Sequence, residues 1–480
     1  MTDLAVSRRT FLRRLAASGA AVTLAACGAQ PTSPTSNTTP GSASGDAVAT
    51  AAPAVASSGP VSIEIWTGWT EQAAKNIEKI LAGYNASQDK VVAKHVVVPE
   101  AMNQKLLAAV SAGTPPAAAI VFGAGTAYQL AAQGALLPLD EIGKPEQVST
   151  LKSWMAPPLW DLGTYKGKYY FASMWNQCWG MFVNTDMAQK AGVDPNKPAQ
   201  TLEELGAVWD KLTVSDSSGN INVLGGDFTD QSVLMARFLG QFADQDGKKI
   251  TANHPNNLKA LEWITERWQR IGPAKLQDFY ASLQNRGERS AGQDPFLSRL
   301  RATYVTGPWH FDTIKQFKPA DFNYTVWPLP SPASADKRGT FTYGDGWIIP
   351  KGSPAPDAAW EIIGAMTGAT GNRDVYTSLF TTWQCVNGPV SKEMINYPTF
   401  KEKVISQCPG YEQVFLADLF DSQQYLYPPK IPTSASYADA MSAEWEKARI
   451  GQKTPQQALD FVQETAQKEL NDWYTQNPGT

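Results

Sequence analysis

Cysteine and histidine are scarce in this chain, which limits the chemistry that the sequence can support. Three histidines occur, His95, His254 and His310, and they lie far apart. The four cysteines have spacings that match no metal site. We therefore expect neither a bound metal ion nor another cofactor.

An excess of positive charge and long apolar segments are also missing. The formal net charge is −4 at pH 7, and no basic patch stands out along the chain. This argues against a nucleic-acid partner. Beyond the N-terminal region, no apolar run reaches the roughly 20 residues that a transmembrane helix requires.

The N-terminus has the features of an export signal. Ser7–Leu12 reads SRRTFL, a twin-arginine signature, and the apolar stretch Leu15–Ala26 is too short to span a bilayer. Leu24–Cys27 matches a lipobox, in which the cysteine becomes the lipidated N-terminus. We expect residues 1–27 to be a signal peptide that directs export in the folded state. Lipid on Cys27 would hold the protein on the outer face of the cytoplasmic membrane, in a periplasmic or extracellular setting.

Residues 28–60 are rich in Ala, Ser, Thr, Pro and Gly and contain no aromatic residue. Such a segment cannot bury a core, so it is expected to be a disordered tether. The roughly 420 residues that follow are too many for one ordinary core, and they predict two lobes.

Three cysteines remain if Cys27 carries lipid, namely Cys178, Cys385 and Cys408. An exported protein can pair two of them in a disulfide. Cys385 and Cys408 are the pair nearest in sequence, but the sequence leaves the pairing open.

The first part of the expected folded region alternates strands and helices. Val61–Trp66 reads VSIEIW and alternates as a strand does, and apolar residues from Ala73 to Tyr84 follow at helical spacing. Val91–Val98 predicts a second strand. A further helix is expected over residues 102–110, and a short strand follows it. This alternation is typical of a mostly parallel α/β sheet.

Ligands of open α/β sheets bind beyond the carboxyl ends of the strands. Trp66 and Trp69 lie at the end of the first expected strand, and Gly123–Thr126 follow the third. We therefore expect these residues at a cleft. The Gly-Ala-Gly sequence lacks the spacing of a dinucleotide-binding fingerprint.

The segment Tyr165–Met187 combines aromatic and amide side chains. Trp175, Asn176 and Gln177 fall in a predicted loop between two extended stretches. Flat rings beside amides suit a sugar, which has apolar C–H faces and a polar hydroxyl rim. The alternative is that the aromatic residues belong to the core.

Several short motifs occur in an order that resembles one known family. The WTGW sequence at Trp66–Trp69, NQKLLAAVSAGTPP at 103–116, AAQGALLPLD at 131–140 and YKGKYYFA at 165–172 resemble the extracellular solute-binding proteins of carbohydrate ABC importers, the maltose-binding-protein-like family. The resemblance extends from about Val61 to the C-terminus. It departs at residues 117–119, where three alanines stand in place of a stretch that commonly includes Asp.

This resemblance implies a two-lobed α/β periplasmic-binding-protein-like fold, or Venus flytrap, with a hinge and a central ligand cleft. The implied lobes are residues 61–172 with 318–375, and residues 173–317 with 376–480. The chain would first cross between the lobes near Tyr169–Trp175. The segments Tyr324–Pro330 and Phe341–Pro350 would return it to the first lobe.

The same resemblance adds residues to the expected cleft. Gly-Pro-Trp at 307–309 would present the Trp309 ring, and the Tyr343–Trp347 stretch would pass the ligand. The expected ligand-binding residues are Trp66, Trp69, Trp175, Asn176, Gln177, Trp309, Tyr343, Asp345, Trp347, Trp383 and Tyr437.

The function that follows is that of a monomeric, non-enzymatic binding protein. It would capture a sugar or oligosaccharide by hinge closure and deliver it to the membrane subunits of an ABC importer. A non-sugar solute, such as glycerol phosphate, a polyamine or a peptide, remains an alternative. A secreted glycoside hydrolase is another, but it needs a pair of carboxylates across the cleft, and the sequence offers no distinctive pair.

Overall fold

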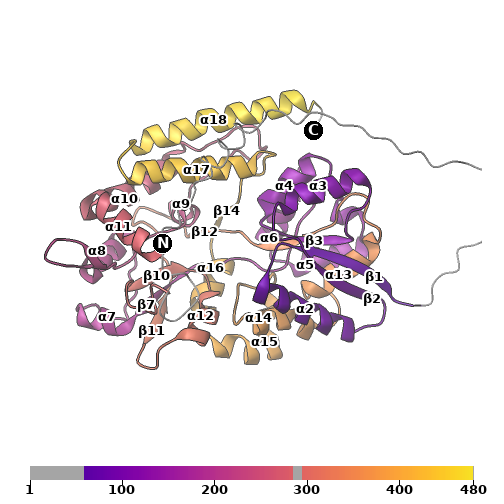
Figure 1. Cartoon of the computed structure of the whole chain (residues 1–480), viewed down its shortest axis with the longest axis horizontal. Helices are drawn as coiled ribbons and strands as arrows, with labels where there is room; N and C mark the ends of the chain where they lie inside the picture. Colours follow the sequence, from indigo (N-terminus) through magenta and orange to yellow (C-terminus); the bar gives the residue numbers. More distant parts are fainter. Residues whose placement is uncertain (1–58, 285–293, 479–480) are drawn as a thin grey trace, which may run out of the picture. The chain divides into compact units, whose positions relative to one another are not determined.

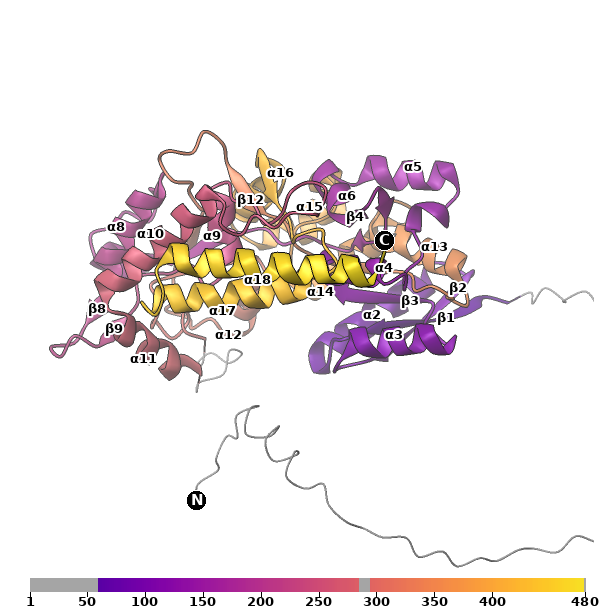
Figure 2. The ribbon, with the colours of Figure 1, turned by 90° about the horizontal axis from the view of Figure 1, so that it is seen from above.

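The computed structural model describes residues 59–284 and 294–478. The predicted signal peptide at residues 1–27, the lipidation site Cys27 and residues 28–58 of the tether lie outside the described residues. Two main sheets, each surrounded by helices, organise the folded part of the chain (Figures 1 and 2). Within these ranges, none of the helices combines the length and the apolar character needed to cross a membrane.

The larger sheet has five strands in the order β2-β1-β3-β13-β6. The strands are β1 Val61–Thr67, β2 Val91–Val97, β3 Ala118–Phe122, β6 Ala172–Ser173 and β13 Asp345–Ile348. Both β2 and β3 pair with β1 in parallel, whereas β13 is antiparallel to β3. The alternation predicted for the first strand is confirmed, because Ile63 and Ile65 are buried while Ser62 and Glu64 are exposed.

Helices pack their apolar sides around this sheet (Figure 1). They are α2 Glu71–Ala86, α3 Met102–Ala112, α4 Ala124–Ala132, α5 Pro145–Trp154, α6 Pro157–Gly163 and α13 Pro356–Met366, with a small hairpin formed by β4 Thr164–Tyr165 and β5 Lys168–Tyr169. On α2, the buried residues include Ile77, Leu81 and Tyr84, as the helical spacing predicts. Gly113 ends α3 in the left-handed region, with φ of 73°.

The smaller main sheet has three antiparallel strands in the order β10-β7-β11. These are β7 Gly180–Asn184, β10 Thr303–Thr306 and β11 Tyr324–Trp327. The pairing corrects one prediction, which placed Tyr324–Trp327 on the return of the chain to the first lobe. Val326 instead faces Phe182 across the smaller sheet, and the return to the larger sheet takes place at β13.

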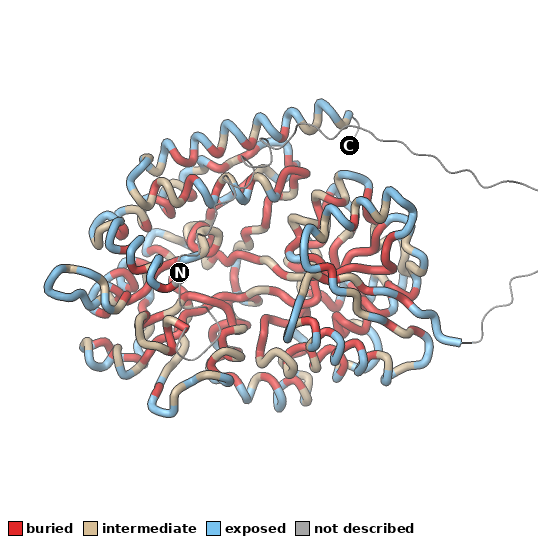
Figure 3. Tube along the Cα trace, viewed as in Figure 1, coloured by how far each residue is buried: buried red, intermediate tan, exposed pale blue. Residues whose placement is uncertain are grey.

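A second group of helices surrounds the smaller sheet (Figures 1 and 2). They are α7 Thr185–Lys190, α8 Leu202–Leu212, α9 Gln231–Arg237, α10 Pro255–Ile271, α11 Pro273–Gln284, α17 Ser434–Arg449 and α18 Pro455–Gln476, with a hairpin of β8 Val214–Ser215 and β9 Ile221–Val223. Thr201 caps α8, because its Oγ1 accepts the Glu204 amide at 3.1 Å. The Glu204 carboxylate accepts the amide of Gln200 and not that of Thr201, so the capping box is incomplete. In Figure 3, the outer faces of α17 and α18 are exposed and the strands are mostly buried.

The remaining elements connect the two groups. They are α12 His310–Phe317, β12 Gly339–Phe341, α14 Arg373–Thr382, α15 Pro398–Lys403, α16 Ala417–Phe420 and β14 Gln424–Leu426, of which β12 and β14 pair in parallel. Tyr376 and Phe380 of α14 share one core with Ile63 and Ile77. The lobe boundary predicted after residue 375 therefore does not separate two hydrophobic cores.

Cys385 and Cys408 form a disulfide, with Cα atoms 6.8 Å apart. Cys178 is buried and has a free thiol. The pair that is nearest in sequence is therefore the one that forms, and it links the segment after α14 to the segment after α15.

Candidate functional site

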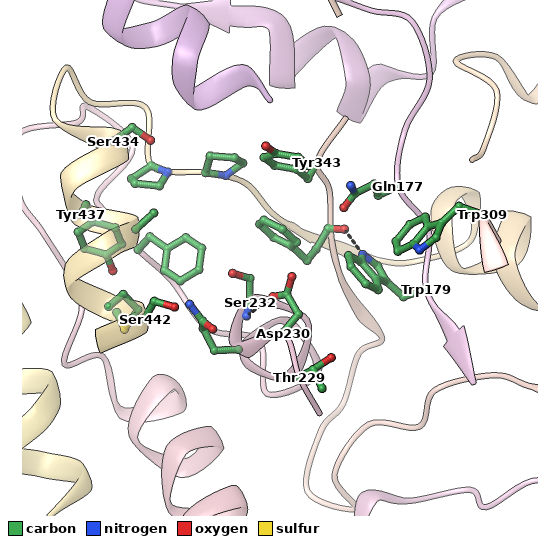
Figure 4. Close-up of a pocket in the computed structure, with 17 residues that line it drawn as sticks. Gln177, Trp179, Thr229, Asp230, Ser232, Trp309, Tyr343, Ser434, Tyr437 and Ser442 are labelled. Carbon is green, nitrogen blue, oxygen red and sulfur yellow. Dashed lines mark hydrogen bonds between the residues drawn. The ribbon is translucent and has the colours of Figure 1, made fainter. Parts of the chain in front are cut away.

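A pocket of about 550 Å³ lies between α9, α17 and the segments that connect the two sheets (Figure 4). Its wall combines aromatic rings with hydroxyl, amide and carboxylate groups, and no Lys, Arg or His of the described residues lines it. The lining residues are Gln177, Trp179, Thr229, Asp230, Gln231, Ser232, Phe242, Trp309, Phe341, Tyr343, Pro428, Pro429, Ser434, Tyr437, Ala438, Met441 and Ser442. A concave site with this mixture is typical of small-molecule binding.

Trp179 and Trp309 form one corner of the pocket. Their rings meet edge to face, with centroids 5.5 Å apart and planes at 87°. Trp179 Nε1 donates a hydrogen bond to the Phe341 carbonyl at 3.1 Å, drawn as the dashed line in Figure 4. The Trp309 ring folds back over Gly307, where a Cβ would come within 1.8 Å of it. The Gly-Pro-Trp sequence thus needs glycine at its first position to admit this ring orientation.

A buried ionic network holds Trp179 in place from behind. Asp418 on α16 accepts the Trp179 backbone amide at 3.0 Å and the Thr340 hydroxyl at 2.7 Å. The same carboxylate pairs with Arg237 of α9 at 2.5 Å and with Arg338 at 3.4 Å. Both Asp418 and Arg237 are fully buried. The network therefore joins α9, α16 and the start of β12 to the pocket wall.

Tyr343 forms the opposite wall and contacts an element of the larger sheet. Its ring stacks on Phe341, with centroids 5.9 Å apart and planes at 22°. On the other side it lies against Gly123, where an added Cβ would come within 2.3 Å of the ring. Gly123 also has φ of 80°, so glycine is required there both for backbone conformation and for this close approach.

Two of the segments that connect the sheets run side by side through hydrogen bonds. Met174 donates its amide to the Asp345 carbonyl at 2.9 Å, and Gln177 donates to the Tyr343 carbonyl at 2.6 Å. Trp175 Nε1 donates to Asp345 Oδ2 at 3.0 Å. Burial raises the pKa of Asp345 to about 6, although the Trp175 hydrogen bond opposes this shift.

Asn176 connects the same region to a third segment. Its backbone amide and carbonyl pair with those of Gly388, at 2.9 and 2.7 Å. Its side chain is fully buried, and within the described part of the chain neither amide atom has a hydrogen-bond partner. Gly344 approaches so closely that a Cβ would lie 2.2 Å from the Trp175 carbonyl oxygen. The three segments are thus packed together through their backbones.

Three tryptophans form a separate cluster beside these segments. The ring centroids of Trp69, Trp175 and Trp383 are 5.3 to 6.1 Å apart. Trp69 also meets Phe122 edge to face at 5.2 Å, and the Phe122 side chain is 45% exposed. Because Trp69 and Trp383 are half-buried, the cluster offers aromatic surface outside the pocket lining.

Asp230 is the single carboxylate that the described residues contribute to the pocket lining. It is the N-cap of α9, where Oδ1 accepts the Ser232 amide at 2.8 Å and the Val233 amide at 3.4 Å. Its side chain is partly exposed because it lines the pocket, yet the surrounding protein still removes most of its solvation. Desolvation raises the pKa of Asp230, and the α9 amides oppose that shift.

Tyr437 and Ser434 bring the first turns of α17 to the pocket. Tyr437 is buried, and its hydroxyl has no hydrogen-bond partner among the described residues. A buried hydroxyl without a partner is costly, because it has lost its water without gaining a replacement. A solute in the pocket would supply that partner.

The structure brings only part of the predicted site together. Gln177, Trp309, Tyr343 and Tyr437 line the pocket, and Trp69, Trp175, Trp383 and Asp345 gather at the tryptophan cluster. Asn176 is buried between these groups.

Trp347 and Trp66 lie elsewhere. Trp347 is 1% exposed and packs in the core of the larger sheet, so the stacking role predicted for it is not kept. Trp66 is half-buried within β1 and packs against the core formed by α3 and α4, away from the pocket lining.

Sequence reasoning missed several lining residues, above all Asp230, Ser232 and Phe242. Thr229–Ser232 precede the apolar run of α9, and this pattern indicates a helix N-cap. It carries no sign that the helix start faces a pocket. Arg237 and Asp418 are 181 residues apart in sequence, and no local pattern connects them.

Comparison with known families gives one match that spans most of the chain. The family described as "Bacterial extracellular solute-binding protein" matches residues 79–405. Among curated proteins, the sn-glycerol-3-phosphate-binding periplasmic protein UgpB of Brucella abortus is 27% identical over 157 residues, which cover 32% of this chain and 36% of UgpB. The maltodextrin-binding protein MdxE of Bacillus subtilis is 25% identical over 114 residues, covering 24% of this chain and 25% of MdxE. The matches thus span about a third or less of these relatives.

Several solved structures share the fold over most of the chain. The mannobiose complex of CpMnBP1 has a TM-score of 0.69 and 24% identity, covering 85% of this chain and 99% of that one. The cyclic alpha-maltosyl-1,6-maltose binding protein of Arthrobacter globiformis has a TM-score of 0.66 and 21% identity, covering 86% and 100%. The sugar-binding protein MalE of Xanthomonas citri has a TM-score of 0.66 and 16% identity, covering 87% and 100%. The fold is therefore the mixed α/β, two-lobed periplasmic-binding-protein-like fold, as predicted.

Proposed function

Because the chain belongs to the bacterial extracellular solute-binding protein family, we propose that it captures a sugar or oligosaccharide for an ABC importer. The observation that carries the proposal is the 550 Å³ pocket, in which aromatic rings face amide, hydroxyl and carboxylate groups. Trp309 offers ring surface to the C–H surfaces of a sugar, and the stacked pair of Phe341 and Tyr343 adds apolar edges to the wall. Gln177, Asp230 and the Tyr437 hydroxyl, which has no partner among the described residues, offer hydrogen bonds to its rim.

Capture would take place by hinge closure about the three connecting segments. The pocket draws residues from these segments and from α9 and α17. Helices of the two groups also touch beside the pocket, where Lys430 pairs with Asp161 of α6 at 2.9 Å and the lining residue Ser434 lies against Gly125. A solute that binds the closed form more tightly shifts the population toward it. The closed form would then present its surface to the membrane subunits of the importer.

The charge of the pocket argues against glycerol phosphate, the ligand named for UgpB. Recognition of a phosphate favours arginine or free helix N-terminal amides. In the described part of the chain no cationic side chain lines the pocket, and the first amides of α9 are already occupied by Asp230. A second negative charge beside Asp230 would be repelled. A neutral sugar meets neither obstacle.

Membership of this family makes the protein an exported transport component and not a glycoside hydrolase. We extend this to a specific route and anchor, namely twin-arginine export through Arg8 and Arg9 and lipidation of Cys27, on the sequence features alone. Mass spectrometry of the mature protein tests the anchor. An acylated peptide that begins at Cys27 supports it, and an unmodified N-terminus further along the chain contradicts it.

The experiment for the proposed function is a ligand screen by tryptophan fluorescence and thermal shift. The panel contains mono- and oligosaccharides, glycerol phosphate, polyamines and short peptides. A solute that binds only the folded state raises the melting temperature. A saturable shift with a saccharide that is recovered intact supports the proposal. A response confined to glycerol phosphate, polyamines or peptides overturns it, as does a cleaved sugar.

A further inference from the structure

The three carboxylates around the pocket differ in how their charge is balanced. Asp418 is paired with Arg237 and Arg338, so its charge is compensated within the protein. Asp230 and Asp345 form no ion pair with any described Lys, Arg or His, in contrast to Asp418. A desolvated carboxylate is unfavourable without a counter-charge. A positively charged group on a bound solute would therefore stabilise these two carboxylates.

Asp230 is the one of the two that a solute can reach directly. It lines the pocket, and Figure 4 shows its carboxylate turned toward the interior beside Ser232. Oδ1 accepts the α9 amides, and the Ser232 hydroxyl also bonds the carboxylate. Because the carboxylate lines the pocket and carries no counter-charge, a bound solute can still reach it.

Asp345 adds negative potential from the other side of Tyr343. Burial raises the pKa of the Tyr343 hydroxyl, and the charges of Asp345 and Asp230 raise it further. Both carboxylates are therefore near enough to act on the Tyr343 hydroxyl, and the Tyr343 ring belongs to the pocket wall. The Trp309 ring, which lines the pocket, itself attracts cations through its ring quadrupole.

Within residues 59–284 and 294–478, no Lys, Arg or His side chain near the pocket is free to act as a counter-charge for Asp230 or Asp345. Arg237 and Arg338 are committed to Asp418, and Lys430 is committed to Asp161. His310, next to Trp309, is buried beside Asp294, and burial lowers its pKa to about 4. It is therefore neutral at physiological pH.

We infer that the solute is a saccharide that carries a protonated amine, and that the ammonium group sits against Asp230. This inference rests on the proposed function and narrows it to amino sugars. The buried Tyr437 hydroxyl, which lacks a partner in the described structure, is a second polar group that such a solute would engage. The carboxylate accepts a charge-assisted hydrogen bond from the ammonium group, which is stronger than one from a hydroxyl.

Isothermal titration of the full-length protein with matched sugars tests this inference. Oligomers of glucosamine, galactosamine and mannosamine are compared at pH 6.5 with their N-acetylated forms and with the neutral oligosaccharides of the same linkage. Acetylation removes the charge and keeps the ring. We expect an amino oligosaccharide to bind at least tenfold more tightly than both of its uncharged counterparts, which corresponds to about 1.4 kcal/mol.

Asp230→Asn provides the matched variant. Asparagine is as good an N-cap as aspartate, so α9 keeps its start while the charge is lost. We expect this variant to lose the preference, so that the amino oligosaccharide and its neutral counterpart bind it with affinities within about twofold of each other. Asp472→Asn, on the surface of α18, is the control and should leave the preference unchanged.

The outcomes separate this inference from the proposed function. If a neutral sugar binds as tightly as its amino counterpart, recognition of an amine is contradicted and the proposed sugar-binding function is retained. Binding of spermidine or putrescine with no saccharide overturns both, and so does the absence of any response. An amine preference that survives in Asp230→Asn overturns the placement at Asp230.

Discussion

The indole nitrogen of Trp175 donates a hydrogen bond to Asp345 Oδ2 at 3.0 Å, across two segments that connect the sheets. Trp175 also contacts Trp69 and Trp383, so this bond joins the tryptophan cluster to the segment between β12 and β13, which carries Tyr343. The carboxylate at this position therefore links the connecting segments to the pocket wall.

The raised pKa of Asp345, about 6, predicts a specific pH dependence of stability. The carboxyl binds its proton more tightly in the folded than in the unfolded chain, so its contribution is favourable below about pH 4 and is lost as pH rises through 6. Asp345→Asn removes this titration. We expect the free energy of unfolding of the variant, taken relative to that of the wild type, to increase by about 2 kcal/mol between about pH 4.5 and pH 7.5.

Urea unfolding of both proteins at the two pH values measures this difference. Asp472→Asn serves as the control, because its exposed pair with Lys468 lies far along α18. If the free energies of unfolding of Asp345→Asn and the wild type change by the same amount between the two pH values, the Asp345 carboxyl does not titrate as stated.

Loss of Asp418 should be among the most damaging single changes in the chain. Asp418→Ala leaves Arg237 buried without a counter-charge and removes the acceptor of the Trp179 amide. We expect a loss of roughly 3–5 kcal/mol in the free energy of unfolding. Asp421→Ala, which breaks only the exposed pair with Lys392, should cost less than about 1 kcal/mol. Equal midpoints for the two variants in chemical denaturation would contradict the role of the network.

Two glycines with positive φ differ in both backbone conformation and contact, because Gly113 has ψ of 21° in the left-handed region and Gly123 has ψ of 146° outside it. Gly113 has φ of 73° and open space where a Cβ would stand, whereas Gly123 has φ of 80° and lies against the Tyr343 ring. Gly113→Ala should cost about 1–2 kcal/mol through backbone strain alone. Gly123→Ala should cost more, because its backbone conformation is more strained for alanine and because Tyr343 has to move. The displacement of Tyr343 should also weaken solute binding.

Stability and solute affinity, measured for both alanine variants, test this pair. Equal losses of stability in the two variants, together with full solute affinity in Gly123→Ala, would contradict the role of the Gly123–Tyr343 contact.

The disulfide predicts a response to reduction. Cys385 and Cys408 are 23 residues apart, and closing a loop of this size stabilises a protein by about 3 kcal/mol. The Cys385→Ser, Cys408→Ser double variant should therefore melt at a lower temperature than the wild type. Adding a reductant should lower the wild-type melting temperature to that of the variant and leave the variant unchanged. A wild type insensitive to complete reduction would contradict this.

Local sequence patterns predict the local elements well. The alternation of β1, the buried side of α2, the glycine at the end of α3 and the Thr201 N-cap of α8 each depend on residues a few positions apart. The place of Trp309 at the site is implied by the family resemblance of Gly-Pro-Trp at 307–309 and not by a local pattern, and Trp309 does line the pocket.

The remaining features depend on pairings across long separations. Phe182 and Val326 face each other in β7 and β11, and nothing in either strand names its partner. The same holds for Arg237 and Asp418. Trp347 shows that an aromatic residue in an expected cleft segment can belong to the core instead, because its position in β13 buries the ring.

The most direct test of the central claim is calorimetric titration of the best saccharide from the screen into wild type, Trp309→Ala and Trp473→Ala. Trp473 is a half-buried tryptophan near the end of α18, away from the pocket lining. Removing a stacking ring from the pocket should weaken binding at least tenfold, or about 1.4 kcal/mol, with Trp473→Ala matching the wild type. Unchanged saccharide affinity in Trp309→Ala would contradict the account that this pocket holds the solute.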